Sequence, residues 1–340
     1  MPKITANTIN AIQLLLNEKK EVLIVSHHNP DGDAIGSMLG LYYALKQENI
    51  EASLIIPNEI PESLSWLPGA DKIIRFSKHK EIAKKIITNS QVIFALDFND
   101  PERLEKMSEL FIKSNATKIL IDHHPSPKKC FNHVISDIAA SSTAELVYVF
   151  TTMLNKEINV DSIAATCLFT GIMTDTGSFS YGCNNPRTFK VAAELVKQGV
   201  NIEDVQQQVY NNFTEGRMRL VGYSLTNKLK VFPEYRTAFI SLTRDELNSF
   251  DYKIGDTEGI VNYPLSIKGI IFSALFIENT DYIKVSLRSK GEFPANKICE
   301  NHFAGGGHKN AAGGKSFASM QETEEQFVSI LKEYKKDLNK

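Results

Sequence analysis

Residues 22–33 of the chain, VLIVSHHNPDGD, join a short apolar run to a polar turn that is rich in ionisable side chains. The run 22–25 has the length and composition of a buried strand. An apolar-periodic segment follows at 34–46 and predicts a helix, in which Gly36 and Gly40 are expected to permit close packing against a neighbour. A buried strand, a polar turn and a helix in this order predict a parallel α/β fold.

The same succession recurs along the first half of the chain. Further apolar runs lie at 53–56, 92–96 and 118–121 and alternate with longer helical patterns. In open α/β sheets, ligands bind beyond the carboxyl ends of the strands, so polar clusters at these ends are expected to meet in one crevice. Those clusters are 26–33, Asp97-Phe98-Asn99-Asp100 and Asp122-His123-His124, joined by Thr174-Asp175-Thr176-Gly177 after the apolar segment 163–173.

The pattern changes after this region. Three helices in succession are predicted at 186–199, 202–211 and 215–228, followed by strands at 237–242, 270–278 and 282–288 and a helix at 319–338. We therefore predict an α/β protein with a parallel-sheet N-terminal domain and a smaller α/β C-terminal domain, and with the active site in the cleft between them. The predicted boundaries are 1–185 for the first domain, 186–228 for a helical linker and 229–340 for the second domain.

Composition excludes several classes of protein. Of the 340 residues, 42% are hydrophobic and 23% are charged, which is typical of a folded globular chain. The formal net charge of −2 argues against binding of long duplex nucleic acid, because that task needs many cations to neutralise phosphates. The four cysteines form no CxxC pair, so neither a zinc ribbon nor a disulfide framework is indicated.

The sequence also bears on location and assembly. No apolar run approaches the roughly 20 residues of a membrane span, so no membrane association is expected. Residues 1–20 lack a basic segment followed by an uninterrupted apolar one, which argues against a secretory signal. We expect a cytoplasmic protein, and the sequence is compatible with a homodimer without indicating one.

The polar clusters have plain explanations when each is taken singly. Asp33 could cap the helix at 34–46, while Asp97 and Asp175 could be ordinary turn residues. Asp122-His123-His124 is harder to explain in this way, because a buried strand seldom ends in three ionisable groups without compensation for their desolvation. Carboxylates and imidazoles together predict metal binding, and four carboxylates with two histidines suit two cations rather than one structural zinc. The ligand types favour Mn²⁺, with Mg²⁺ as the alternative.

These motifs, His27-x-x-x-Asp31-x-Asp33, Asp97, Asp122-His123-His124 and Asp175, resemble the four motifs of the DHH phosphoesterase superfamily in order and spacing. The stretch GGGHKNAAG at 305–313 resembles the signature of the DHH-associated domain, so the resemblance covers nearly the whole chain. Within the superfamily, the chain is similar to the small bacterial oligoribonucleases of the nanoRNase type. RecJ nucleases and family II pyrophosphatases resemble this chain less closely.

The resemblance implies a role for each motif residue. It implies one metal ion held by His27, Asp31 and Asp97, and a second held by Asp33, Asp97, His123 and Asp175. Asp122 would accept a hydrogen bond that orients a ligand histidine, and His124 would face the phosphate that is cleaved. No motif position departs from the family pattern, so the resemblance implies an active enzyme.

Substrate binding is assigned to the second domain. The candidates are Arg288, Gly305, Gly306, Gly307 and His308. Arginine suits bidentate phosphate recognition, and glycines let backbone amides approach phosphate closely. Without the resemblance, Arg288 would be interpreted as an exposed residue at a strand end. The glycines alone are weak evidence, since no Lys-Ser or Lys-Thr follows as in a nucleotide-binding P-loop.

The function implied is hydrolysis, by metal-activated hydroxide, of very short RNA oligonucleotides or of 3′-phosphoadenosine 5′-phosphate (pAp), a nucleotide bisphosphate. Two alternatives stay open. One is an inorganic pyrophosphatase or exopolyphosphatase, and the other is a non-catalytic nucleotide-binding regulator, which would be expected to lack metal ligands.

Overall fold

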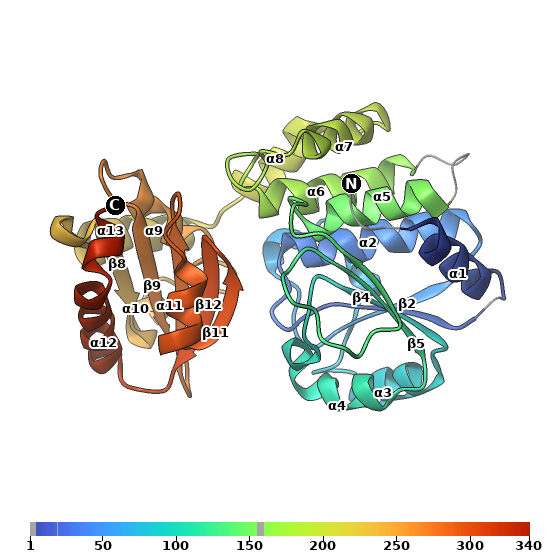
Figure 1. Cartoon of the computed structure of the whole chain (residues 1–340), viewed down its shortest axis with the longest axis horizontal. Coiled ribbons are helices and arrows are strands. Elements are labelled where there is room, and N and C mark those ends of the chain that lie inside the picture. The colour runs from blue at the N-terminus through green and yellow to red at the C-terminus, as the bar shows by residue number, and fades with distance from the viewer. Residues whose placement is uncertain (1–4, 19, 155–159) are drawn as a thin grey trace. The chain divides into compact units, whose positions relative to one another are not determined.

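The computed structural model describes residues 5–18, 20–154 and 160–340 (Figure 1). Part of the segment 1–20 considered above therefore lies outside the described residues. The chain divides into two compact units, Met1–Asn212 and Phe213–Lys340. This division falls inside the segment 186–228 that the sequence predicts as a linker.

The first unit is built on a six-stranded sheet, and every pair of neighbouring strands is parallel. The strand order is β3-β2-β1-β4-β5-β6. The strands are β1 (Val22–Val25), β2 (Ala52–Ile56), β3 (Ile74–Arg75), β4 (Val92–Leu96), β5 (Thr117–Asp122) and β6 (His133–Ser136). The predicted parallel sheet is confirmed. The two edge strands, β3 and β6, were not predicted, because they are short and only partly buried.

Helices cover both faces of this sheet (Figure 1). One face carries α2 (Gly32–Gln47), α5 (Thr143–Leu154) and α6 (Ser162–Asp175), with α1 (Ala6–Asn17), α7 (Pro186–Lys197) and α8 (Ile202–Tyr210) packed around them. The other face carries α3 (Lys80–Asn89) and α4 (Ser108–Lys113), which follows the 3₁₀ segment η3 (Pro101–Met107). Two short 3₁₀ turns, η1 (Glu62–Leu64) and η2 (Ala70–Lys72), lie between β2 and β3. Strands β1 and β4 are buried along their whole length, which explains why both appear in the sequence as continuous apolar runs.

Helices α2 and α6 approach each other through glycine. A Cβ on Gly36 would lie 2.5 Å from the backbone oxygen of Cys167, and a Cβ on Gly40 would lie 2.4 Å from Leu168 Cδ2. Gly32 is equally close to the side chain of Thr174. The close packing predicted for Gly36 and Gly40 is confirmed, and it fixes the start of α2 beside the end of α6.

The second unit also contains a six-stranded sheet, in the order β11-β12-β10-β9-β8-β7. Its strands are β7 (Lys230–Phe232), β8 (Thr237–Leu242), β9 (Phe272–Glu278), β10 (Ile283–Ser289), β11 (Ala304–His308) and β12 (Ala311–Ser316). All pairs are antiparallel except β8 with β9. The predicted strands at 237–242, 270–278 and 282–288 are confirmed. The glycine-rich stretch, to which no element was assigned from the sequence, forms the hairpin β11–β12.

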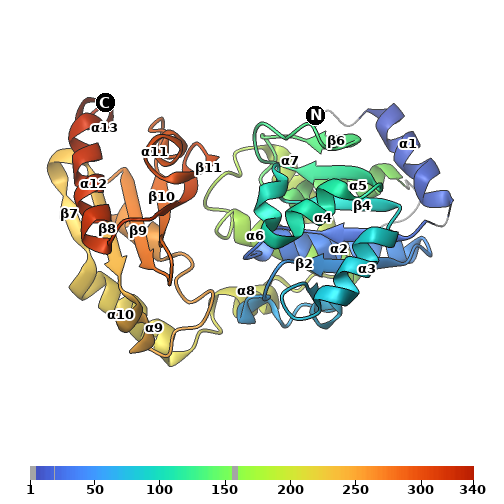
Figure 2. The same ribbon diagram turned by 90° about the horizontal axis from the view of Figure 1, so that it is seen from below.

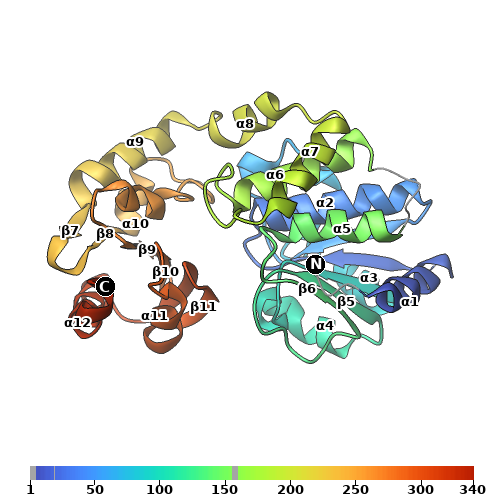
Figure 3. The same ribbon diagram turned by 45° about the horizontal axis from the view of Figure 1, so that its top comes forward.

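Helices again lie on both faces of this sheet (Figures 2 and 3). One face packs against α11 (Ala295–His302), α12 (Met320–Glu333) and α13 (Lys335–Leu338). The other packs against α9 (Glu215–Tyr223), α10 (Arg244–Asn248) and the 3₁₀ segment η6 (Ile260–Ser266). A π-helical turn, η4 (Ser224–Lys228), continues α9, and η5 (Pro233–Tyr235) joins β7 to β8. None of the helices in the described part of the chain is both long and apolar enough to cross a membrane.

The contact between α2 and α6 gives a first prediction. Gly36→Ala should lower the free energy of unfolding by about 1–3 kcal/mol, because the added methyl group meets a backbone oxygen that cannot rotate away. Gly222→Ala is the matched control, since nothing lies within 4 Å of its Cβ position in α9. There the alanine should stabilise the helix by about 0.5–1 kcal/mol. Thermal and urea unfolding of both variants would test this, and a Gly36→Ala protein as stable as the parent would contradict the packing argument.

Candidate active site

The loop after β1 brings His27 and Asp31 to the carboxyl end of the sheet. The carbonyl oxygen of His28 lies 2.9 Å from His27 Nδ1 and can only accept, so the Nδ1 proton points there. His27 Nε2 lies 3.3 Å from Asp97 Oδ2. One ligand atom from each of His27, Asp31 and Asp97 lies within 4.8 Å of the other two. A backbone carbonyl on the far ring nitrogen is the usual way to orient a metal-binding histidine.

The helix cap in this loop is Asp31 rather than Asp33. Asp31 Oδ1 accepts from the backbone N–H of Asp33 at 3.1 Å and from that of Ala34 at 3.0 Å. The alternative interpretation of Asp33 as the cap of its own helix is therefore wrong. Asp33 lies one half-turn further on, where its side chain is buried and points toward another helix.

Asp33 is held by the N-terminus of α5. Its Oδ2 accepts from the Thr143 N–H at 2.6 Å and its Oδ1 from the Ala144 N–H at 2.8 Å. A helix N-terminus favours a negative charge. Burial nevertheless raises the pKa of Asp33 well above its ordinary value, and the neighbouring carboxylates of Asp97, Asp175 and Asp31 raise it further. The charge on Asp33 is thus stabilised from one side and opposed from the other.

Asp97 lies at the centre of the cluster. It follows β4 with a left-handed backbone, φ 64°, which is a costly conformation for a residue other than glycine and recurs at functional sites. Its Oδ2 faces His27, while its Oδ1 accepts from the Thr143 hydroxyl at 2.9 Å and lies 3.7 Å from His123 Nε2. Burial opposes its ionisation, but the His27 hydrogen bond and the nearby imidazoles hold the pKa of Asp97 well below its ordinary value. The two oxygens face two different histidines, as a bridging carboxylate requires.

His123 and Asp175 complete a second group with Asp33. His123 Nε2 lies 3.5 Å from Asp175 Oδ2 and 3.8 Å from Asp33 Oδ2. Its Nδ1 faces the carbonyl oxygen of Ala140 at 3.4 Å, so it repeats the arrangement seen at His27. Burial of its carboxylate raises the pKa of Asp175 to about 6, against a partly compensating attraction from His123.

Asp122 and His124 form a further pair beside Asp97, whose Oδ1 lies 3.7 Å from His124 Nδ1. Asp122 is fully buried, and its Oδ1 lies 2.7 Å from His124 Nδ1. Arg103 Nη1 lies 3.3 Å from His124 Nε2. Arginine can only donate, so Nε2 is the acceptor and the proton of a neutral ring is on Nδ1, facing Asp122. Asp122 thus orients His124, whereas the resemblance led us to expect that it orients a ligand histidine.

The residues of the cluster fit two divalent cations. The two groups, His27–Asp31–Asp97 and Asp33–His123–Asp175, each gather one imidazole and two carboxylates, and Asp97 lies in contact with both. Without a cation, Asp175 opposes the ionisation of Asp33, and Asp31 and Asp97 oppose the ionisation of Asp175. Mixed oxygen and imidazole ligands suit Mn²⁺ or Mg²⁺ and leave no requirement for thiolate.

A partly buried group of one arginine and two carboxylates supports the loop that carries these hydrogen bonds. Arg187, at the start of α7, donates from Nε to Glu145 and from Nη2 to Asp137 at 2.8 Å. Glu145 also accepts from the backbone N–H and the hydroxyl of Ser141, at 3.1 and 2.7 Å. The segment 137–145 is thereby fixed at both ends, and with it the donors of Thr143 and Ala144. Neither these donors nor Arg103 was predicted from the sequence, because each depends on contacts between distant segments.

Arg288 and His308 lie in one row of the second unit's sheet. Ala311 of β12 pairs with His308 of β11 on one side and with Arg288 of β10 on the other. Side chains of directly paired residues point to the same face of a sheet. The glycines make the hairpin possible, since a Cβ on Gly305 would lie 2.1 Å from Gly313 O.

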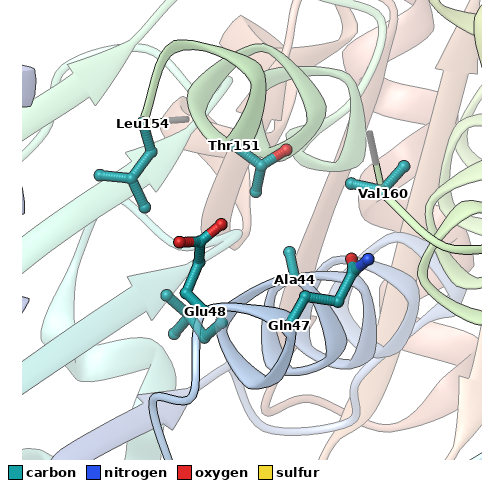
Figure 4. Close-up of a pocket in the computed structure, with 7 residues that line it drawn as sticks. Ala44, Gln47, Glu48, Thr151, Leu154 and Val160 are labelled. Atoms are coloured by element: carbon teal, nitrogen blue, oxygen red, sulfur yellow. The ribbon is translucent and has the colours of Figure 1, made fainter. Parts of the chain in front are cut away.

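A small pocket between α2 and α5 contains none of the predicted residues (Figure 4). It is lined by Ala44, Leu45, Gln47, Glu48, Thr151, Leu154 and Val160. Ala44, Leu45, Gln47 and Glu48 lie at the C-terminal end of α2, whereas Asp31 and Asp33 lie at its start. The pocket is therefore remote from the acidic cluster.

Comparison with known proteins agrees with this geometry. Residues 21–172 match the DHH family N-terminal domain, and residues 237–339 match the DHHA1 domain. A Streptococcus mutans protein described as a probable bifunctional oligoribonuclease and PAP phosphatase, NrnA, is 30% identical over 310 residues, which cover 91% of this chain and 93% of the relative. The chain belongs to the DHH family. This DHH-family chain is accordingly a metal-dependent phosphoesterase.

Two further relatives of this DHH-family chain span most of its length. The Thermus thermophilus protein described as bifunctional oligoribonuclease and PAP phosphatase NrnA is 30% identical over 293 residues, which cover 86% of this chain and 83% of the relative. A crystal structure described as an exopolyphosphatase-related protein from Bacteroides fragilis is 40% identical, with a TM-score of 0.94 and full coverage of both chains.

The raised pKa of Asp175 gives a prediction for the DHH-family site. In EDTA the folded protein favours the protonated form of Asp175. The stability that this protonation contributes is fully present below pH 3.8 and is lost as the pH rises to about 6. Asp175→Asn should remove that loss and leave the metal-free variant at least as stable as the parent near neutral pH. Adding Mn²⁺ should stabilise the parent and stabilise the variant less. Thermal unfolding with EDTA or Mn²⁺ at about pH 5 and pH 7 measures both effects.

Asp71→Asn is the control for this prediction, because Asp71 is an exposed carboxylate in the same unit. Its unfolding curves should match those of the parent under all four conditions. Equal Mn²⁺ stabilisation of the parent and of Asp175→Asn would remove Asp175 from the proposed ligands.

Proposed function

We propose that this enzyme hydrolyses very short RNA oligonucleotides and pAp, with two divalent cations, Mn²⁺ in preference to Mg²⁺. The observation that carries the proposal is the pair of ligand groups that meet at Asp97, a buried carboxylate with one oxygen toward each group. The descriptions of the Streptococcus and Thermus relatives support the choice of substrates.

In this proposal the side chains of the cluster bind and orient. His27, Asp31 and Asp97 hold one cation, and Asp33, Asp97, His123 and Asp175 hold the other. When bound, the two cations stabilise charge on the phosphoryl oxygens and lower the pKa of the attacking water. Water adds to phosphorus as the P–O bond to the leaving hydroxyl breaks, so pAp and water give AMP and phosphate. His124, fixed by Asp122, faces the phosphate.

Recognition of the rest of the substrate is assigned to the second unit. Arg288 and His308 share one face of the sheet, within two strand spacings of roughly 4.8 Å each. An arginine guanidinium and an imidazole at this separation suit a terminal phosphate or a nucleotide rather than a long nucleic-acid chain. Gly305, Gly306 and Gly307 leave the part of β11 that precedes His308 without side chains.

A polyphosphate substrate is the nearest rival. Because the Bacteroides structure is described as exopolyphosphatase-related, polyphosphate substrates are included in the assay below. A regulator without activity is disfavoured, because every ligand position predicted from the motifs is filled.

One assay separates these candidates. The purified protein and Asp97→Ala are incubated with Mn²⁺ and, separately, with pAp, with 5′-labelled RNA from dimers to 24-mers, with pyrophosphate and with tripolyphosphate. We expect the parent to cleave pAp and the shortest RNAs, and Asp97→Ala to lose at least about 10³-fold in rate, since metal stabilisation is worth several kcal/mol. Preference for long RNA, or cleavage of pyrophosphate or tripolyphosphate alone, would overturn the proposal.

The role of Arg288 is tested with two substrates. Arg288→Ala should raise KM for pAp about 10- to 100-fold, because a hydrogen bond to a charged group contributes about 1.5–3 kcal/mol. Hydrolysis of bis-p-nitrophenyl phosphate, which has no second phosphate, should change far less. Lys284→Ala, on the same face of β10, is the control and should leave both substrates unaffected. Equal losses on both substrates would argue against a role for Arg288 in recognising the second phosphate.

A further inference from the structure

Arg103 lies beside the acidic cluster and has no carboxylate partner among the residues that the structure describes. It is half-buried in η3, six residues after Asp97. Its Nη1 donates to the backbone oxygen of Asp97 at 3.0 Å and to His124 Nε2 at 3.3 Å. Both acceptors are uncharged, and within the described chain no Asp or Glu oxygen pairs with this guanidinium.

The other half-buried arginine of the site shows the contrast. Arg187 pairs with Glu145 and Asp137 and so has a purely internal use for its charge. Arg103 uses a single nitrogen, so Nε and Nη2 donate to no other residue that the structure describes. Neither of these nitrogens is among the fully buried atoms that lack a partner, so solvent or a ligand can reach them. A charge held in this way is available to an anion from outside the protein.

The backbone fixes where this charge lies. The Arg103 N–H donates to Asp100 O at 3.0 Å, and the Arg103 carbonyl accepts from the His28 N–H at 2.8 Å. Asp100 in turn caps the same segment by accepting from the Glu102 N–H at 3.0 Å. Arg103 is therefore tied to the loops after β1 and after β4, the two loops that carry His27 and Asp97.

We propose that Arg103 binds the phosphoryl group that is cleaved, as a fixed cation in addition to the metal ions. The proposal rests on the hydrolytic function proposed above. The Asp97 carbonyl and His124 hold Nη1, which leaves Nε and Nη2 to donate to one or two phosphoryl oxygens. Arginine suits this task because its planar fork matches phosphate and its charge persists at every working pH. Arg103 donates hydrogen bonds only, so no proton is transferred to or from it.

The test compares Arg103→Gln and Arg103→Lys with Lys106→Gln, which removes an exposed charge from the same segment. With pAp and saturating Mn²⁺, Arg103→Gln should lose about 10²-fold in kcat/KM, the usual effect of removing one fixed donor to developing charge. Arg103→Lys should recover part of this loss, since lysine keeps the charge but not the fork. Lys106→Gln should match the parent.

Two further measurements separate substrate contact from a merely structural role. Orthophosphate should inhibit Arg103→Gln about 10-fold more weakly than the parent, because the free anion meets the same guanidinium. Mn²⁺ affinity and Tm should stay those of the parent. Parent-like kcat/KM in Arg103→Gln would overturn the proposal, and so would a loss of activity matched by a loss of Mn²⁺ affinity.

Failure of the proposed function is distinguishable from failure of this inference. If the parent cleaves neither pAp nor short RNA, the hydrolytic proposal fails for those substrates. Calorimetric binding of orthophosphate to the Mn²⁺-loaded parent and to Arg103→Gln still decides whether Arg103 binds phosphate. Equal affinities there would overturn the inference.

Discussion

The site depends on the mutual repulsion of carboxylates that the fold forces together. Asp33 and Asp97 are buried, and Asp31 and Asp175 lie next to them. Asp97, Asp175 and Asp31 each raise the free-energy cost of ionising Asp33. At Asp97 the neighbouring imidazoles offset the cost of ionisation. Like charges at short range in a low-dielectric region are unfavourable unless a cation lies between them. The fold holds these carboxylates close together in spite of their repulsion, and bound cations would neutralise that repulsion.

The rest of the first unit holds these charges at fixed positions. Two backbone donors at the start of α5 bind Asp33, and the ion pair of Arg187 with Glu145 and Asp137 fixes the loop before that helix. A buried ion pair contributes little net stability, because desolvation offsets its attraction. Its effect here is to position the backbone donors of Thr143 and Ala144, which in turn orient Asp33, a proposed metal ligand.

Much of this architecture is predictable from local patterns, and the remainder is not. The strands at 22–25 and 92–96 are continuous apolar runs because both faces of the sheet are covered, and proposed metal ligands follow them directly. The hairpin β11–β12 was not predicted, because glycine has a low strand propensity and pairs here only through a close backbone approach. The resemblance implies that Asp122 orients a ligand histidine, and the structure places its carboxylate at His124. Sequence alone does not specify this partner, because it depends on side-chain rotamers. No local sequence pattern indicates a role for Arg103, because its contacts are with segments about 20 and 75 residues away along the chain.

The glycine contacts between α2 and α6 also bear on the size of the ion that the site accepts. Asp31 and Asp33 belong to the start of α2 and Asp175 to the end of α6. Gly36 brings these helices together at backbone distance, and Gly32 lies against the side chain of Thr174. A spacing set by main-chain contact cannot widen through a change of rotamer. Mg²⁺ binds oxygen at about 2.0–2.1 Å, whereas Ca²⁺ needs about 2.3–2.6 Å and more ligands. We therefore expect the seam between the two helices to select cations by ionic radius, favouring small ions over calcium.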